Sequence, residues 1–141
     1  MDLLSPDINS DLIIHIAIKA YNLEETKLYY EDVFGAKSFR VMDDRITFGL
    51  KNLQLVCHLS KQKTEEEKAS FYPNHFGLTF RNIKEYKQYY DRILLFHKKH
   101  VYEFERVRFK ERPDEHRTFI LKDPSSNFIE IKCYRANYDL F

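Results

Sequence analysis

An internal repeat constrains the fold of this chain more than any other feature of its sequence. The segment 12–34 can be laid over the segment 72–94 without a gap, at a separation of 60 residues (75 − 15). The matching pairs are His15 and His75, Asn22 and Asn82, Glu25 and Glu85, Lys27 and Lys87, Tyr29 and Tyr89, and Tyr30 and Tyr90. Two copies of one unit usually pack about a pseudo-twofold axis, which brings equivalent residues close together. The two repeated histidines are therefore candidates for one shared site.

The first copy has the pattern of a strand, a helix and three further strands. Apolar residues alternate with other types over 12–20, which predicts a strand whose aliphatic side faces the core and whose other side carries His15. Asn22 has the form of a helix N-cap, and Gly35 supplies the stop. Three further strands are predicted at 38–42, 46–50 and 53–59.

The second copy repeats this order. A strand carrying His75 precedes a helix that begins after Asn82 and runs to about His100. Its last three strands are predicted at 102–109, 117–121 and 128–134, with a turn at 123–127. We therefore predict an α+β domain of two tandem βαβββ modules, 12–59 and 74–136, joined by the charged linker 60–73.

The last strands of the two copies also correspond. The segment 53–58 lies over 129–134 at a separation of 76 residues (130 − 54), so Gln54 is the partner of Glu130. Each first strand then carries a histidine, and each last strand carries a polar partner. We expect these four side chains, His15, Gln54, His75 and Glu130, to converge.

Composition excludes several classes of protein. Lys plus Arg (23) and Asp plus Glu (22) nearly cancel, so no large field of one sign is available to bind nucleic acid or an anionic membrane. No apolar run approaches the roughly 20 residues that span a bilayer, and the acidic start lacks the basic region of a signal peptide, so a cytoplasmic location is expected. Cys57 and Cys133 fall on apolar strands, where buried thiols are expected rather than a disulfide.

Two imidazoles and one carboxylate on neighbouring strands can occupy one face of a divalent metal ion and leave positions open for substrate. His15, His75 and Glu130 form such a set, which suits Fe(II), Mn, Ni, Co or Zn. Gln54 is either a weak fourth ligand or a hydrogen-bonding group behind the ligands. Metal binding requires neutral imidazoles, so it should weaken as the pH falls through the range in which histidine protonates.

Other polar residues are candidates for roles beside the metal. By strand alternation His58 shares a face with Gln54, where it is either a proton-transfer group or a strand-end histidine that meets solvent. Three basic residues either line a cleft for an anionic substrate or form the wet face of an edge strand; they are Arg106, Arg108 and Lys110. The remaining histidines are expected at the surface without a role; they are His97, His100 and His116.

Three motifs give the chain a resemblance to a known family over about residues 12–136. They are His15-Ile16-Ala17-Ile18 with the helix end Tyr-Tyr-Glu-Asp-Val-Phe-Gly, Asn74-His75-Phe76-Gly77, and Asp123-Pro124-Ser125-Ser126-Asn127-Phe128-Ile129-Glu130. On these residues the chain resembles the vicinal oxygen chelate superfamily, which includes glyoxalase I, extradiol dioxygenases, fosfomycin-resistance enzymes and bleomycin-resistance proteins. The last of the three motifs is the most specific.

The resemblance implies that the paired modules form a cup-shaped mixed sheet with the helices outside. It also implies that a divalent metal in the cup, held by His15, His75 and Glu130, chelates two oxygens of a small substrate. Gln54 stands where glyoxalase I has a metal-coordinating glutamate, and an amide cannot abstract a proton as a glutamate does. The expected function is therefore a metal-dependent enzyme of glyoxalase-like or dioxygenase-like type, with His58 as the nearest acid or base. The alternative is a non-catalytic small-molecule binding protein of the bleomycin-resistance type. A homodimer is expected, with the cup completed either within one chain or between chains.

Overall fold

The computed structural model describes residues 12–61 and 73–136, so most of the predicted linker 60–73 lies outside the described residues. Within these two ranges, no helix has the length and apolar character needed to cross a membrane.

The order of elements is strand, helix and three strands, twice over. The first copy contains β1 (Ile14–Ala20), α1 (Leu23–Phe34), β2 (Lys37–Val41), β3 (Arg45–Leu50) and β4 (Leu53–Leu59). The second contains β5 (Phe76–Phe80), α2 (Ile83–Phe96), the short 3-10 helix η1 (Lys98–His100), β6 (Val101–Arg108), β7 (His116–Lys122) and β8 (Phe128–Tyr134). The predicted fold class, an α+β domain of two tandem βαβββ modules, is confirmed.

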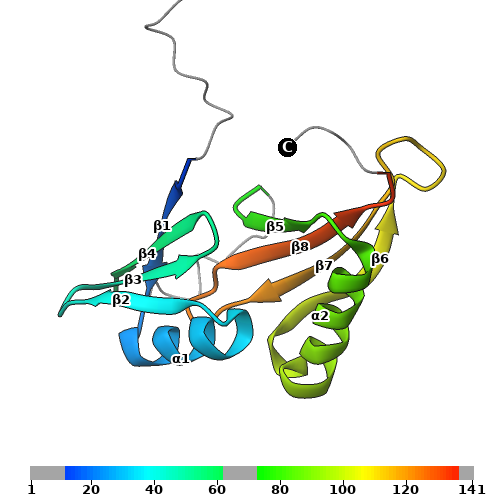
Figure 1. The fold of residues 1–141 in the computed structure, drawn as a ribbon. Helices are drawn as coiled ribbons and strands as arrows, with labels where there is room; N and C mark the ends of the chain where they lie inside the picture. The colour runs from blue at the N-terminus through cyan, green and yellow to red at the C-terminus, as the bar shows by residue number, and fades with distance from the viewer. Residues whose placement is uncertain (1–11, 62–72, 137–141) are drawn as a thin grey trace, which may run out of the picture.

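The strands form two four-stranded mixed sheets, ordered β1-β4-β3-β2 and β5-β8-β7-β6. In each sheet the first strand of the module pairs in parallel with the last, and the remaining neighbours are antiparallel. Figure 1 shows both helices on one side of the two sheets, so the described helices leave the opposite faces uncovered. Strands β1 and β5 each lie at an edge of their own sheet.

The helix boundaries follow from their caps. The Asn22 side chain accepts a hydrogen bond from the Glu25 backbone N–H (3.0 Å), and α1 ends at Gly35, whose φ of 64° is easily reached by glycine. Asn82 caps α2 in the same way, accepting from the backbone N–H groups of Lys84 and Glu85. The second helix was predicted to reach about His100, but α2 ends at Phe96, and the last residues form η1.

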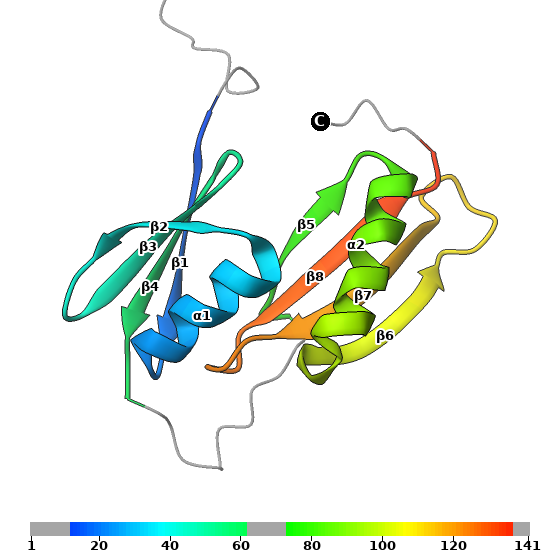
Figure 2. The same cartoon turned by 60° about the horizontal axis from the view of Figure 1, so that its bottom comes forward.

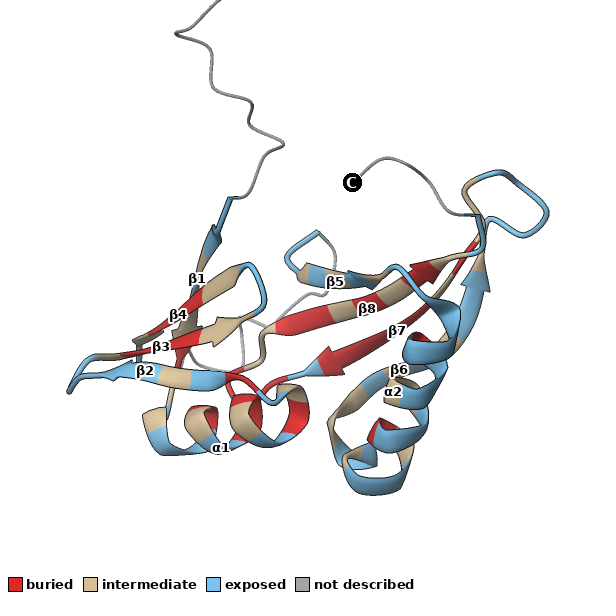
Figure 3. Ribbon diagram, in the orientation of Figure 1, coloured by how far each residue is buried: buried red, intermediate tan, exposed pale blue. Residues whose placement is uncertain are grey.

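The core lies between the helices and the sheet faces that they cover. Tyr30 of α1 packs on Phe48 of β3 with ring centroids 5.4 Å apart, and Tyr90 of α2 packs on Phe119 of β7 at 4.7 Å. Figure 3 shows that buried residues concentrate on α1 and on the inner strands β3, β4, β7 and β8. Cys57 and Cys133 are buried free thiols, as predicted.

The turn at 123–127, between β7 and β8, ties the second module to the first. Asp123 Oδ2 accepts a hydrogen bond from the Tyr30 hydroxyl (2.8 Å), and the Ser125 hydroxyl accepts one from the Tyr21 backbone N–H (2.8 Å). The Asn127 side chain donates to the Lys19 carbonyl (2.8 Å). Because these bonds reach both β1 and α1, they fix how the two modules sit against each other (Figure 2).

Candidate functional site

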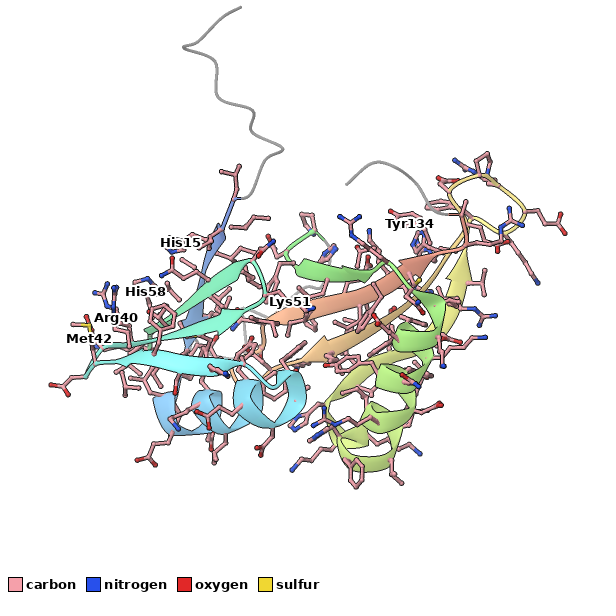
Figure 4. All side chains as sticks on the ribbon, in the orientation of Figure 1. His15, Arg40, Met42, Lys51, His58 and Tyr134 are labelled. Atoms are coloured by element: carbon pink, nitrogen blue, oxygen red, sulfur yellow. The ribbon has the colours of Figure 1, made fainter. Side chains whose placement is uncertain are left out.

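The uncovered face of the first sheet carries one half of the predicted site. His15 on β1 lies directly opposite Gln54 on β4, and His58 on the same strand lies opposite Lys19 and Arg45. Side chains of directly opposite residues share one face of a sheet, so these groups lie on one surface. Figure 4 shows His15 and His58 on the side of the sheet away from α1. His15 is exposed, whereas Gln54 and His58 are half-buried.

The second half lies on the uncovered face of the second sheet. Glu130 on β8 is opposite Gly77 on β5, and His75 comes two residues before that glycine. A Cβ atom at Gly77 would lie 2.8 Å from the backbone oxygen of Glu130, so the missing side chain lets β5 approach β8 closely. The Glu130 carboxylate lies 3.5 Å from the Lys132 ammonium.

The two halves belong to different sheets of the chain. Across residues 12–61 and 73–136, no group of three or more His, Cys, Asp and Glu side chains could hold a metal ion. The chain thus brings His15 together with Gln54, and it brings the start of β5 beside Glu130, but it keeps these two pairs on separate sheets. The donor types still fit a divalent metal, because two imidazoles, a carboxylate and an amide oxygen are a common mixed set.

The start of β1 and the two residues before it are apolar and exposed. Leu12, Ile13 and Ile14 have exposed fractions of 46%, 75% and 61%, and in the described part of the chain β1 pairs only with β4. An edge strand with free backbone groups and apolar side chains is suited to packing against another chain. The edge next to His15 is therefore available to a second copy.

An aromatic side chain lies beside the first half of the site. A Cβ at Gly49, which is opposite Gln54, would lie 3.9 Å from the Phe39 ring, so that ring lies over the glycine on the uncovered face. Phe39 is 58% exposed. Arg40 and Met42 are on the same side of the sheet (Figure 4), which gives the face both apolar and cationic groups.

The three predicted basic residues are not equivalent. Arg106 is opposite Thr118 and Arg108 is opposite His116, so both lie in register with the uncovered face. Strand β6 ends at Arg108, and Phe109 has a φ of 53°, which breaks the alternation. Lys110 is consequently an exposed residue of the following turn and is not aligned with the other two.

His116 was predicted to be a surface residue, and this was wrong. Its exposed fraction is 8%, and its Nδ1 lies 3.0 Å from the Asp114 carbonyl oxygen. The ring packs against Phe109 (centroids 5.7 Å apart) and Tyr134 (5.0 Å). The cause is that β7 begins at His116 and not at Arg117, which draws the side chain into the sheet.

Sequence reasoning missed Thr118 and Lys132, which lie opposite each other on the face that carries Glu130. The signal was present, because strand alternation from Glu130 places Lys132 and Tyr134 on the same side. The pairing with Thr118, however, depends on the register between β7 and β8.

Residues 12–131 match the family model of the Glyoxalase/Bleomycin resistance protein/Dioxygenase superfamily. A glyoxalase/bleomycin resistance protein/dioxygenase from Alicyclobacillus acidocaldarius is 36% identical, with 92% of this chain and 96% of that chain covered and a TM-score of 0.81.

Two more distant structures share the fold. Lactoylglutathione lyase from Agrobacterium tumefaciens is 16% identical, with 86% of this chain and 92% of that chain covered and a TM-score of 0.61. The fosfomycin resistance protein FosX from Listeria monocytogenes is 17% identical, with 86% and 91% covered and a TM-score of 0.61. No curated protein sequence matches the chain.

Proposed function

Because the chain belongs to the Glyoxalase/Bleomycin resistance protein/Dioxygenase superfamily, we propose that it is a divalent-metal-dependent enzyme acting on a small oxygenated molecule. The observation that supports this proposal is that residues of metal-ligand type lie on the open faces of both sheets. His15 and Gln54 lie together on the first sheet, and Glu130 lies on the second beside the strand that follows His75.

The metal site is proposed to form between two copies of the chain. His15, with Gln54 beside it, would meet His75 and Glu130 of the partner subunit, and two such sites would form in a symmetric dimer. The exposed apolar segment at the start of β1 supports this arrangement, because packing against another chain would bury Ile13 and Ile14. The bonds from the 123–127 turn support it as well, since they hold the two modules of one chain in a fixed relation.

When bound, the ion would supply Lewis acidity to two oxygens of the substrate. The remaining tasks fall to side chains of this chain. Gln54 would orient a ligand or substrate through its amide, which donates and accepts hydrogen bonds but does not take up a proton. His58, four residues further along the same strand and on the same face, would hold or deliver a proton at its imidazole. Arg106 and Arg108 would attract an anionic substrate to the second sheet.

A non-catalytic binding protein is the second candidate, and one observation favours it. Phe39 is exposed over Gly49 beside Gln54, and an aromatic ring on an open face is suited to stacking on a small molecule. A binder of this kind would need no stoichiometric metal.

Elemental analysis of protein purified without a chelating tag tests the proposal. We expect about one divalent ion per chain in the wild type, a large loss in His15→Ala, and no loss in the matched control His97→Ala, because His97 lies at the end of α2. Substoichiometric metal that His15→Ala does not change would favour the binding protein.

Co-expression of two complementary variants tests where the site forms. In a mixed dimer of His15→Ala and Glu130→Ala chains, one shared site loses both residues and the other keeps all of them. Random assembly should therefore recover about a quarter of the wild-type metal content, because about half of the dimers are mixed and each keeps one intact site. A site made within each chain would recover none.

A further inference from the structure

Four side chains form a row across the uncovered face of the second sheet. Lys132 on β8 is opposite Thr79 on β5 and opposite Thr118 on β7, and Thr118 is in turn opposite Arg106 on β6. Directly opposite residues have Cβ atoms about 4.5–5.5 Å apart, so the row sets two cations and two hydroxyls close together. Every group in this row is a hydrogen-bond donor.

Thr118 is the residue in this row that packing does not explain. It is 4% exposed, and its hydroxyl oxygen is buried with no hydrogen-bond partner among the described residues. A buried hydroxyl without a partner destabilises a fold, so its presence calls for an explanation. Here the hydroxyl lies between a lysine and an arginine, where an incoming anion would give it an acceptor.

The charges on this face have partners that a ligand can replace. Lys132 lies 3.5 Å from Glu130, and its ammonium is 5.3 Å from the centre of the Tyr134 ring. Arg106 lies 3.1 Å from Glu103, with 51% of its side chain exposed. If Glu130 held a divalent cation as proposed, its carboxylate would neutralise Lys132 less, and the ammonium would gain from a new anionic partner.

We propose that Lys132, Thr118 and Arg106 form a subsite for an oxyanion group of the substrate. The inference rests on the proposed function, because it names the substrate class of that site. Residues two apart on a strand lie about 7 Å apart, which sets the spacing between the Lys132 row and Glu130. The substrate would thus be a small molecule that carries its anionic group about 7 Å from the end that chelates the metal. A planar carboxylate and a tetrahedral oxyanion share this chemistry.

Titration of the 17.1 kDa chain with sulfate and with acetate, followed by amide chemical shifts in NMR spectra, tests the subsite. Ionic strength is held constant with chloride, and the full-length protein is used with and without added metal. We expect saturable shifts centred on Thr118 and Lys132, and tighter binding in the metal-loaded protein. Tighter binding of sulfate would indicate a tetrahedral group, and tighter binding of acetate a carboxylate.

Two variants test the subsite, and a third is the control. Lys132→Met should weaken anion binding about tenfold to a hundredfold, because it removes a charged donor. Thr118→Val should weaken binding about three- to tenfold while leaving the unliganded protein equally stable or more stable, because its hydroxyl has no partner to lose. Lys87→Met, which removes an exposed lysine on α2, should leave binding unchanged.

Unchanged binding in Lys132→Met and Thr118→Val, or equal weakening in Lys87→Met, would overturn the inference. A clear loss of stability in Thr118→Val would also overturn it, because that hydroxyl would then have a partner. The metal content of Lys132→Met separates this failure from failure of the proposed function. If the protein binds metal but shows no localised anion site, the proposed function stands and the subsite is refuted. If it shows a localised anion site but binds no metal, the subsite is supported and the metal-dependent enzyme is contradicted.

Discussion

Two adjacent tyrosines on α1 give a sharp test of how the modules are held together. Tyr29 and Tyr30 are both buried, with exposed fractions of 4% and 2%. The Tyr30 hydroxyl donates a 2.8 Å hydrogen bond to Asp123 of the second module, whereas the Tyr29 hydroxyl is buried without a partner in the described part of the chain. Replacing either residue by phenylalanine keeps the ring and removes one oxygen.

The expected effects differ in sign. Burial, together with the nearby charge of Asp123, raises the pKa of Tyr30 well above its ordinary value, so its hydroxyl keeps the proton that it donates. Hydrogen bonds to charged groups contribute about 1.5–3 kcal/mol. In Tyr30→Phe, Asp123 would keep its bonds from the Ser125 and Asn127 backbone N–H groups and from the Asn127 side chain. The loss in free energy of unfolding should therefore lie near the lower end of this range, at about 1.5–2 kcal/mol. Tyr29→Phe should be neutral or stabilising by up to about 1 kcal/mol, because it removes an unpaired polar atom.

Thermal and urea unfolding followed by circular dichroism measure both effects. Tyr30→Phe should lower Tm by about 4–8 °C, and Tyr29→Phe should leave it equal or higher. All samples need one protein concentration, because association shifts apparent stability. Equal destabilisation by the two variants would refute the reasoning, since both rings are retained and are buried to nearly the same extent.

Two further outcomes are expected from the same geometry. Gly77→Ala should cost about 1–3 kcal/mol in urea unfolding and lower the metal content, because the added Cβ would lie 2.8 Å from the Glu130 backbone oxygen. Gly49→Ala, where the nearest atoms are 3.9 Å away, is the matched control and should be tolerated, and equal costs in the two variants would count against the close approach of β5 to β8. Burial raises the pKa of the Asp123 carboxyl group above its ordinary value, although hydrogen bonds from Asn127, Tyr30 and Ser125 act in the opposite direction. The carboxyl group therefore binds its proton more tightly in the folded state than in the unfolded state. The contribution of Asp123 to stability is therefore greatest below about pH 4 and is lost as the pH rises through the folded pKa. Asp123→Asn should abolish that part of the pH dependence, and a stability difference between the two proteins that is constant with pH would contradict the assignment.

The local structure could be predicted from the sequence because it depends on short-range signals. Asn22, Gly35 and Asn82 mark helix boundaries through caps that involve residues at most five positions away. The repeat indicated which strands carry the polar residues but not their register: His15 lies opposite Gln54, whereas Glu130 lies opposite Gly77 and not opposite His75. The predicted exposure of His116 was wrong because a shift of one residue in the start of a strand decides whether a side chain is buried in the sheet or meets solvent.

The arrangement of the modules could not be predicted in the same way. It depends on the 123–127 turn, whose three side-chain contacts join residues 93 to 108 positions apart. The motif at Asp123 was recognisable as a turn, and in the structure its side chains also bond the first module. A pattern within one module carries no information about bonds of that range, so the four donor residues were expected to converge before the placement of the sheets was known.

The proposed division of the metal donors has a thermodynamic consequence. If each site takes His15 from one chain and His75 and Glu130 from the partner subunit, metal binding and dimer formation are linked, and each must strengthen the other by the same factor. Removing the ion would then promote dissociation and expose Ile13 and Ile14 at the start of β1, whose exposed fractions in a single chain are 75% and 61%. The apolar edge and the polar donors next to it would thus act together, because the edge brings the second copy close and the donors define the register in which it binds.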